Sequence, residues 1–180
     1  DNLIEKISID TIADKSNVAL LCLPNGISST LTRGLLERGV KVIDLSADYR
    51  YKSLDQWKKI YSNISSKYKR DDDDLCKEAV YGLPEINNND ISKSRLIACP
   101  GCYPTSALIP LIPLLSQGII DHEGIVIDSK SGTSGGGREP NQKLLLSECG
   151  DGLSAYGLIN HRHTSEIEQI AGLISGNDIE

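Results

Sequence analysis

The sequence predicts an α/β fold organised around a parallel β-sheet, and three consecutive segments carry that prediction. Residues 17–23 form an almost continuous apolar run, as expected for a parallel strand covered on both faces. Residues 28–38 repeat apolar side chains at helical spacing, with a serine at the start as the expected N-cap and Gly39 just past the end. Residues 40–45 are again strand-like. A strand, a helix and a strand within about thirty residues form a βαβ unit, whose two strands run parallel.

The rest of the chain predicts further helices and strands. These are expected to be helices over 54–63 and 164–174 and strands over 95–99 and 124–130. Another helix is expected directly after Cys102, where Pro110 and Pro113 would kink it or shift its start. Residues 64–79 are expected to be a solvated polar connection, because basic side chains there stand beside an acidic run, and residues 87–90 a turn.

Composition limits the class of protein. At 180 residues the chain fits one domain, or one domain and part of another. The net charge is −6, and no run of basic residues interleaved with aromatic residues is present. Both observations argue against a nucleic-acid partner. We find no apolar stretch of membrane-spanning length and no signal peptide, and five unevenly spaced cysteines do not resemble a disulfide framework; a cytoplasmic location is expected. The chain begins at Asp1 rather than Met, so we expect an excerpt of a longer polypeptide.

The sequence around Cys102 indicates a nucleophile. The strand expected over 95–99 ends in a Pro-Gly turn, Cys102 comes next, and an apolar run of helix length follows. A thiol in that position lies at the positive end of a helix, where free backbone N–H groups favour the thiolate, the form that attacks carbon.

Two other interpretations of Cys102 stay open from the residues alone. It could be a small buried hydrophobic residue, as lone cysteines usually are. It could also form a redox pair with Cys99, because the two make a Cys-x-x-Cys sequence ahead of a helix. No second Cys-x-x-Cys is present to complete a four-ligand site, so no metal site is expected.

A segment rich in glycine and hydroxyl side chains, residues 129–138, follows the strand expected over 124–130. Exposed N–H groups and the cations of Lys130 and Arg138 would suit an anionic ligand. Glycine-rich runs are also typical of flexible surface loops, and the spacing matches neither the Walker nor the Rossmann motif. Both interpretations stay open.

Three further residues are candidates for a site. His161 or His163 could be a general acid or base, since imidazole titrates near neutrality. In an extended segment their side chains would point to opposite sides, so only one of them needs to face the site. Arg50 follows the strand over 40–45 and could bind a phosphate or carboxylate with two parallel hydrogen bonds. The alternatives are structural histidines and a surface salt bridge.

Taken together, these segments resemble the N-acetyl-γ-glutamyl-phosphate reductase family, which is related to aspartate-semialdehyde dehydrogenase. Six matching pieces occur in the family's order and cover most of the chain from Leu20 to Gln169. They are residues 23–26, 42–50, 79–85, 100–105, 131–138 and 161–167. The resemblance implies the later part of a Rossmann-like domain over residues 1–101, joined over 102–180 to the start of an α+β substrate domain of the dehydrogenase dimerisation type.

The resemblance also implies roles for individual residues. Cys102 is similar to the family's nucleophile, His161 or His163 to its acid/base, and Arg50 and Arg162 to groups that hold substrate or phosphate. The implied nicotinamide-binding residues are Ser131, Gly132, Ser134, Gly135, Gly136 and Gly137. The implied reaction is NADPH-dependent reduction of a small acyl phosphate, N-acetyl-L-glutamyl 5-phosphate, by a homodimer or homotetramer. Because the family's dinucleotide fingerprint is missing, we expect these 180 residues alone not to bind NADPH. The alternatives are aspartate-semialdehyde dehydrogenase and a thiol–disulfide oxidoreductase.

Overall fold

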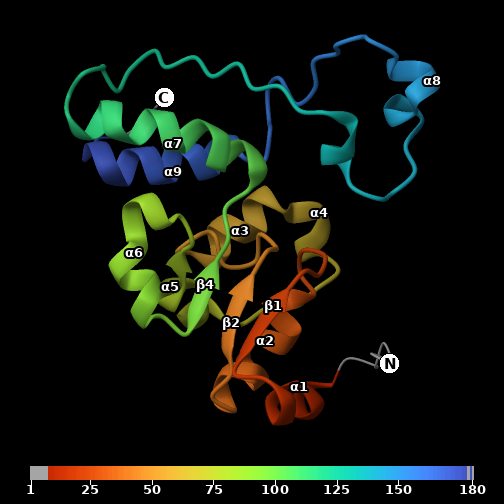
Figure 1. Ribbon diagram of the computed structural model, residues 1–180, viewed down its shortest axis with the longest axis vertical. Helices are drawn as coiled ribbons and strands as arrows, with labels where there is room; N and C mark the ends of the chain where they lie inside the picture. The colour runs from red at the N-terminus through yellow and green to blue at the C-terminus, as the bar shows by residue number, and fades with distance from the viewer. Residues whose placement is uncertain (1–7, 178, 180) are drawn as a thin grey trace. The chain divides into compact units, whose positions relative to one another are not determined.

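The computed structural model describes residues 8–177 and 179, and the chain divides into two compact units, Asp1–Thr105 and Ser106–Glu180 (Figure 1). The described part of the first unit holds a four-stranded sheet in the order β1-β2-β4-β3, and every strand pair is parallel. Its strands are β1 (Val18–Leu21), β2 (Lys41–Asp44), β3 (Val80–Tyr81) and β4 (Leu96–Ala98). The predicted α/β fold with a parallel sheet is therefore confirmed.

Helices alternate with these strands along the chain. The first unit contains α1 (Ile9–Lys15), α2 (Ser28–Glu37), α3 (Leu54–Ile60), α4 (Ser62–Ser65), α5 (Asp73–Glu78) and α6 (Pro84–Lys93). The chain continues with α7 (Cys102–Ser116), the 3₁₀ turns η1 (Thr133–Gly136) and η2 (Gln142–Leu144), α8 (Leu146–Cys149) and α9 (Thr164–Ser175). Among the described residues, no helix has both the length and the apolar character needed to cross a membrane.

One face of the sheet carries the core of the first unit. The parallel register sets side chains in rows, Ala19 with Val42 and Leu96, and Leu21 with Asp44 and Ala98. All of these are buried beneath apolar side chains of α2, α3 and α5. The alternate residues of β1 point the other way, and Val18 and Leu20 are 42% and 63% exposed. The expectation that this strand is covered on both faces is wrong for the described residues, because its second face has no covering layer there.

The predicted polar connection over residues 64–79 contains a helix instead, α5. Asp73 and Asp74 lie in its first turn, where carboxylates offset the positive end of the helix dipole. Leu75 and Cys76 on its inner side are buried in the core. The predicted turn over 87–90 also lies inside a helix, α6, although Asn87 kinks it with φ −124° and ψ 20°. The short elements α1 and β3 were not predicted.

The strand predicted over 124–130 does not form in the described structure. The backbone there is irregular, and Val126 is 90% exposed. A strand needs a neighbour to satisfy its N–H and C=O groups, and none of the described strands pairs with this segment. Apolar alternation by itself could not reveal that a partner strand is missing.

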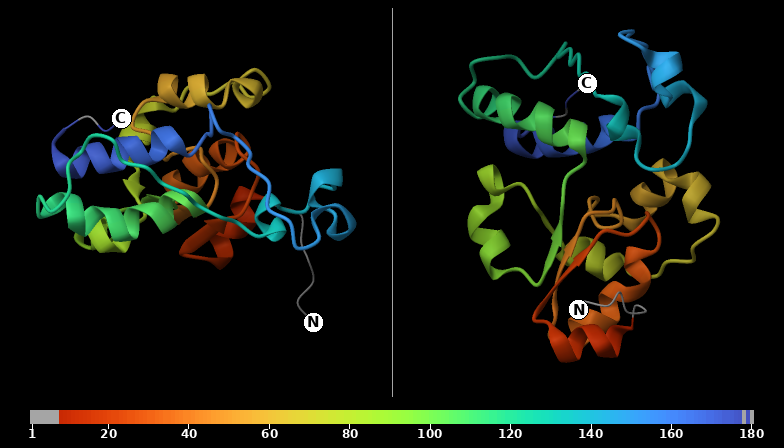
Figure 2. Two further views of the ribbon diagram at one scale, coloured as in Figure 1. Left: turned by 90° about the horizontal axis from the view of Figure 1, so that it is seen from above. Right: turned by 45° about the vertical axis from the view of Figure 1, so that its right-hand side comes forward.

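The second unit contains the predicted C-terminal helix, confirmed as α9. Figures 1 and 2 show α9 beside α7, which has buried apolar residues after its first turn, and Ile170 and Ala171 of α9 are buried. Pro110 and Pro113 lie inside α7, so the helix continues through both of them. Both are exposed on its surface. Each proline removes one N–H from the hydrogen bonds of the helix. The helix nevertheless begins at Cys102, so the two prolines do not shift its start.

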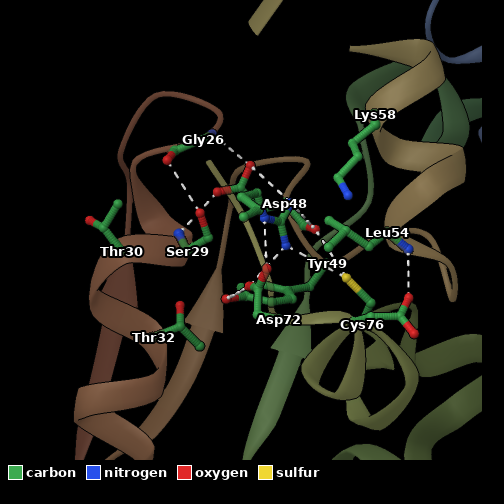
Figure 3. A network of polar contacts seen from close by, with 12 residues as sticks. Gly26, Ser29, Thr30, Thr32, Asp48, Tyr49, Leu54, Lys58, Asp72 and Cys76 are labelled. Atoms are coloured by element: carbon green, nitrogen blue, oxygen red, sulfur yellow. Dashed lines mark hydrogen bonds and ion pairs between the residues drawn. The ribbon is translucent and has the colours of Figure 1, made fainter. Parts of the chain in front are cut away.

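A charged cluster lies buried in the first unit, where the sequence predicted a solvated connection. Arg70 and Asp72 are only 7% and 5% exposed, and the guanidinium donates from Nε to Oδ1 and from Nη2 to Oδ2 of Asp72, both at 3.0 Å. The Tyr49 hydroxyl donates to the same carboxylate at 2.7 Å, as Figure 3 shows. Arg70 also covers the rings of Tyr49 and Trp57, with Cζ 5.1 and 4.3 Å from their centroids. Pairing and ring stacking together compensate the burial of this charge.

Gly26 is a position where an added methyl group should be costly. Its φ is +84°, and a Cβ there would lie 2.5 Å from Cδ2 of Tyr68. Gly39 is the matched control, because its φ is +78° with open space around it. We expect Gly39→Ala to lower the free energy of unfolding by about 1 kcal/mol and Gly26→Ala by roughly 3 kcal/mol, since the second adds overpacking to backbone strain. Urea unfolding followed by circular dichroism measures both; equal losses would contradict the close approach of Tyr68.

Candidate active site

Cys102 lies at the carboxyl edge of the sheet, where ligands bind in open α/β folds. The strand β4 ends at Ala98, and the turn Cys99–Gly101 leads into α7, whose first residue is Cys102. Cys99 N–H donates to the carbonyl of Asp44 at 2.8 Å, which ties this turn to the end of β2. The Gly101 carbonyl accepts from both N–H and Oγ1 of Thr105, each at 2.9 Å. The turn is therefore fixed on both sides of the thiol.

The Cys102 side chain is exposed, and all five cysteines lie among the described residues as free thiols. The interpretation of Cys102 as a buried hydrophobic residue is therefore wrong. Cys99 is half-buried, and burial, with the charge of Asp44 as a further cause, raises the pKa of its thiol. A thiol with a raised pKa is a poor nucleophile at neutral pH. The two cysteines of the Cys-x-x-Cys sequence thus differ in exposure.

Arg50 braces the turn before Cys102. It is 8% exposed, and it donates from Nε to the Cys99 carbonyl at 2.7 Å and from Nη2 to the Leu45 carbonyl at 3.1 Å. Because it is buried and bonded to the main chain, it is not the surface salt bridge that the sequence left open. Its guanidinium joins the loop after β2 to the loop after β4, three residues from the thiol.

Two buried carboxylates at this edge were missed by sequence reasoning. Asp44 ends β2 on the buried face of the sheet and accepts from N–H and Oγ of Ser46 at 3.0 and 2.7 Å. Asp48 accepts from the N–H of Gly26 at 2.7 Å and from that of Ser29 at 3.0 Å (Figure 3). Burial raises the pKa of both carboxyls, and hydrogen bonds oppose that shift. An acidic residue ending an apolar strand was the signal available for Asp44.

The two candidate histidines of the second unit lie against each other. Their ring centroids are 4.9 Å apart and edge-on, and the Tyr156 ring packs on His161 at 5.5 Å. The His163 backbone N–H donates to Nδ1 of His161 at 3.2 Å. Because Nδ1 accepts a hydrogen bond, neutral His161 carries its proton on Nε2. The segment is a turn rather than an extended strand, so the condition under which the two rings would point to opposite sides is not met.

Burial lowers the pKa of His161, and the neighbouring charge of Arg162 lowers it further. Arg162 itself is exposed, whereas His163 is 5% exposed at the start of α9. Burial and the charge of Arg162 both favour the neutral form of the His161 imidazole. A ring with a lowered pKa holds a proton less tightly, so its protonated form is a better general acid.

The glycine-rich segment is exposed along residues 131–138, and part of it folds as η1. Gly137 adopts φ +84°, and a Cβ on Gly135 or Gly136 would collide with Ser131 Oγ or Leu144 Cδ1. The backbone itself therefore favours glycine only at Gly137, whereas at Gly135 and Gly136 a movable side chain would have to shift; the absence of side chains leaves the peptide groups of the segment open to a bulky ligand.

The first unit brings Cys102, Arg50 and the two buried carboxylates to one edge of the sheet, and the second holds the histidine pair and the glycine-rich segment. Two family models match the chain: the NAD binding domain of semialdehyde dehydrogenase over residues 2–94, and the dimerisation domain of semialdehyde dehydrogenase over residues 102–180. These matches confirm the Rossmann-like and dimerisation-type interpretation of the fold, and they support a nicotinamide cofactor.

Curated relatives agree with the resemblance seen in the motifs. Proteins named N-acetyl-gamma-glutamyl-phosphate reductase from Prochlorococcus marinus strains CCMP1986 and MIT 9515 are 91% and 89% identical over all 180 residues, which cover 51% of each relative. The protein of that name from strain MIT 9211 is 56% identical over 180 residues, or 50% of its length. The chain thus spans about half the length of the curated relatives it matches. With both halves matched by its domain models, the chain belongs to the semialdehyde dehydrogenase family.

Proposed function

We propose that the whole protein containing these residues reduces N-acetyl-L-glutamyl 5-phosphate to N-acetyl-L-glutamate 5-semialdehyde and releases phosphate, a step of arginine biosynthesis. The observation that carries the proposal is an exposed thiol in the first turn of α7, past the carboxyl end of β4. The names of the relatives supply the substrate.

In this proposal the Cys102 thiolate attacks the acyl carbon of the substrate. A carbon–sulfur bond forms, the carbon–oxygen bond to phosphate breaks, and a thioester remains on Cys102. The positive end of α7 is suited to stabilise the oxyanion of the tetrahedral adduct. Sulfur serves because it attacks readily and also leaves readily.

The nicotinamide cofactor, when bound, supplies the hydride that reduces the thioester carbon. The resulting oxyanion reforms the carbonyl as the carbon–sulfur bond breaks, and His161 or His163 gives its proton to the departing Cys102 sulfur, which releases the semialdehyde and the free thiol. The lowered pKa of His161 makes its protonated form the stronger proton donor toward the departing sulfur.

Arg50 and Arg162 are proposed to hold the substrate or its phosphate. Arg162 is exposed next to His161 and carries a positive charge that would attract an anion. Arg50 donates to the Cys99 and Leu45 carbonyls, which places its positive charge beside the Cys102 turn. This gives Arg50 a second, bracing function alongside the proposed one.

The residues present fit a nicotinamide cofactor at the glycine-rich segment. Its exposed, side-chain-poor backbone suits the close approach of a bulky group. The residues proposed to contact the cofactor are Ser131, Gly132, Ser134, Gly135, Gly136 and Gly137. We propose NADPH as the physiological form. We also propose a homodimer or homotetramer, which the dimerisation-domain match supports, and the cytoplasm as its compartment, which the free thiols support.

The substrate can be tested by running the reaction backwards with NADP⁺ and phosphate. We expect kcat/KM for N-acetylglutamate semialdehyde to exceed that for aspartate semialdehyde by about a hundredfold or more, because a site built for the larger acetylated substrate leaves polar groups unpaired with the smaller one. The measurement is initial NADPH formation by absorbance with each aldehyde. The reverse preference would instead favour an aspartate-semialdehyde dehydrogenase.

A further inference from the structure

The loop Cys22–Ile27, here called the β1 loop, follows β1 at the same sheet edge as Cys102. It leads directly into α2. Cys22 and Pro24 in this loop are exposed, and the matched NAD binding domain includes it. Ligands of open parallel sheets bind outside the carboxyl ends of the strands, so the β1 loop is a candidate wall of the cofactor site.

The conformation of the β1 loop is imposed from outside it. The N-cap of α2 is Ile27, whose side chain carries no hydrogen-bond acceptor, so the predicted serine N-cap is wrong. The Asp48 carboxylate supplies the cap instead, with Oδ1 on the Gly26 N–H and Oδ2 on the Ser29 N–H (Figure 3). A parallel bridge runs from the Ala47 N–H to Oδ1 of Asn25 at 2.9 Å. The loop after β2 thus holds the β1 loop.

Asp48 is itself held firmly in place. Its side chain is fully buried, and its own N–H donates to Oγ of Ser46 at 3.1 Å. Arg70 donates from Nη1 to the Asp48 carbonyl at 2.9 Å, and the same nitrogen lies 4.0 Å from Oδ1. Both carboxylate oxygens accept an N–H, a pattern that favours the ionised form and opposes the rise in pKa that burial causes. In that form Asp48 places a negative charge at the N-terminus of α2.

This charge decides what the β1 loop can receive. A free helix N-terminus binds phosphate, but here an N–H of the first turn of α2 already binds the protein's own carboxylate. A phosphate at this point would meet that negative charge. An uncharged part of a dinucleotide, such as a ring or a ribose, meets no such repulsion.

We propose that Asp48 is a positioning residue for the nicotinamide cofactor: it caps α2 and fixes the β1 loop in the shape that receives an uncharged part of the cofactor. The inference rests on the proposed use of NADPH. It assigns no chemical step to Asp48. Arg50, in the same loop after β2, donates to the Cys99 carbonyl in the turn before Cys102. One segment therefore contacts both the β1 loop and the turn that carries the thiol.

The test is Asp48→Asn in the whole protein, compared with Asp74→Asn. The two changes remove the same charge, but Asp74 is an exposed partner of Arg33 on α5. Asparagine at position 48 sets an NH₂ group against the N–H of either Gly26 or Ser29. We expect the Kd and KM for NADPH to rise about tenfold in Asp48→Asn, because misplacement of a binding wall weakens binding. At saturating NADPH, kcat and the rate of Cys102 alkylation should stay within about twofold of the parent, and Asp74→Asn should match the parent throughout.

The direction in which the Kd for NADPH changes in Asp48→Asn distinguishes a positioning role from simple repulsion of the cofactor phosphates. If Asp48 only repelled cofactor phosphates, Asp48→Asn would bind NADPH more tightly, and that result or an unchanged Kd overturns the inference. Asn25→Ala is the second variant, because it removes the parallel bridge and leaves the charged cluster intact. It should raise the Kd for NADPH in the same direction, and an unchanged Kd there counts against the inference. A parent that binds NADPH without reducing the acyl phosphate would overturn the proposed function alone.

Discussion

Cys102→Ala is expected to lower reductase activity by about three orders of magnitude or more, since it removes the group that forms the thioester. Cys99→Ala is the matched control three residues earlier. Its thiol is half-buried with a raised pKa, so its loss should leave activity within about threefold of the parent. The measurement is NADPH oxidation with the acyl phosphate, using the whole protein for each variant.

The same pair of variants separates the acyl-enzyme mechanism from thiol–disulfide exchange. A redox pair needs both sulfurs, so equal losses in the two variants would favour the oxidoreductase alternative. Alkylation by iodoacetamide adds an independent measurement. Peptide mapping should find Cys102 modified ahead of Cys22, because both are exposed but only Cys102 lies at the N-terminus of a helix, and Cys76 modified last, because burial raises its thiol pKa to about 11.

Arg70→Met is expected to destabilise the first unit strongly. The change keeps an apolar stem of similar length and removes the guanidinium, which leaves the buried carboxylates of Asp48 and Asp72 without their cation. Breaking a buried pair by removing one partner costs about 3–5 kcal/mol. Arg33→Met is the matched control, because Arg33 makes a similar two-bond pair with Asp74 on the surface.

The free energy of unfolding of the control Arg33→Met should fall by less than about 1 kcal/mol, as expected for a solvent-exposed pair. Urea unfolding monitored by far-ultraviolet circular dichroism gives the free energy of unfolding for each variant. If the two substitutions cost the same, the buried cluster would contribute no more than a surface ion pair. The difference between them is therefore the quantity to measure.

Local pattern was sufficient for the parts of the fold whose stability is local. The strands β1, β2 and β4 and the helices α2, α7 and α9 follow from apolar periodicity and from a glycine or Pro-Gly turn at their ends. Elements that depend on distant partners were not accessible in this way. The short helix α5 is rich in acidic residues and forms because Leu75 and Cys76 reach a core built by other segments.

The same distinction, between residues identified by local sequence and residues identified only by tertiary packing, applies to the candidate site. Cys102 could be found because its strand, turn and helix are contiguous in the sequence. Asp48 and Arg70 could not, because they come together from positions 22 residues apart and neither stands in a periodic pattern. Charged runs are usually solvated, and only tertiary packing brings Arg70 and Asp72 inside while Asp71 and Asp74 remain exposed.

The position of Trp57 has a practical consequence. It is the single tryptophan of the 180 residues, and it is fully buried with a guanidinium 4.3 Å from its ring centroid. Indole emission from this chain therefore originates beside the charged cluster and nowhere in Ser106–Glu180. A change in the wavelength or intensity of that light would report water entering around one ion pair, without any label having to be attached.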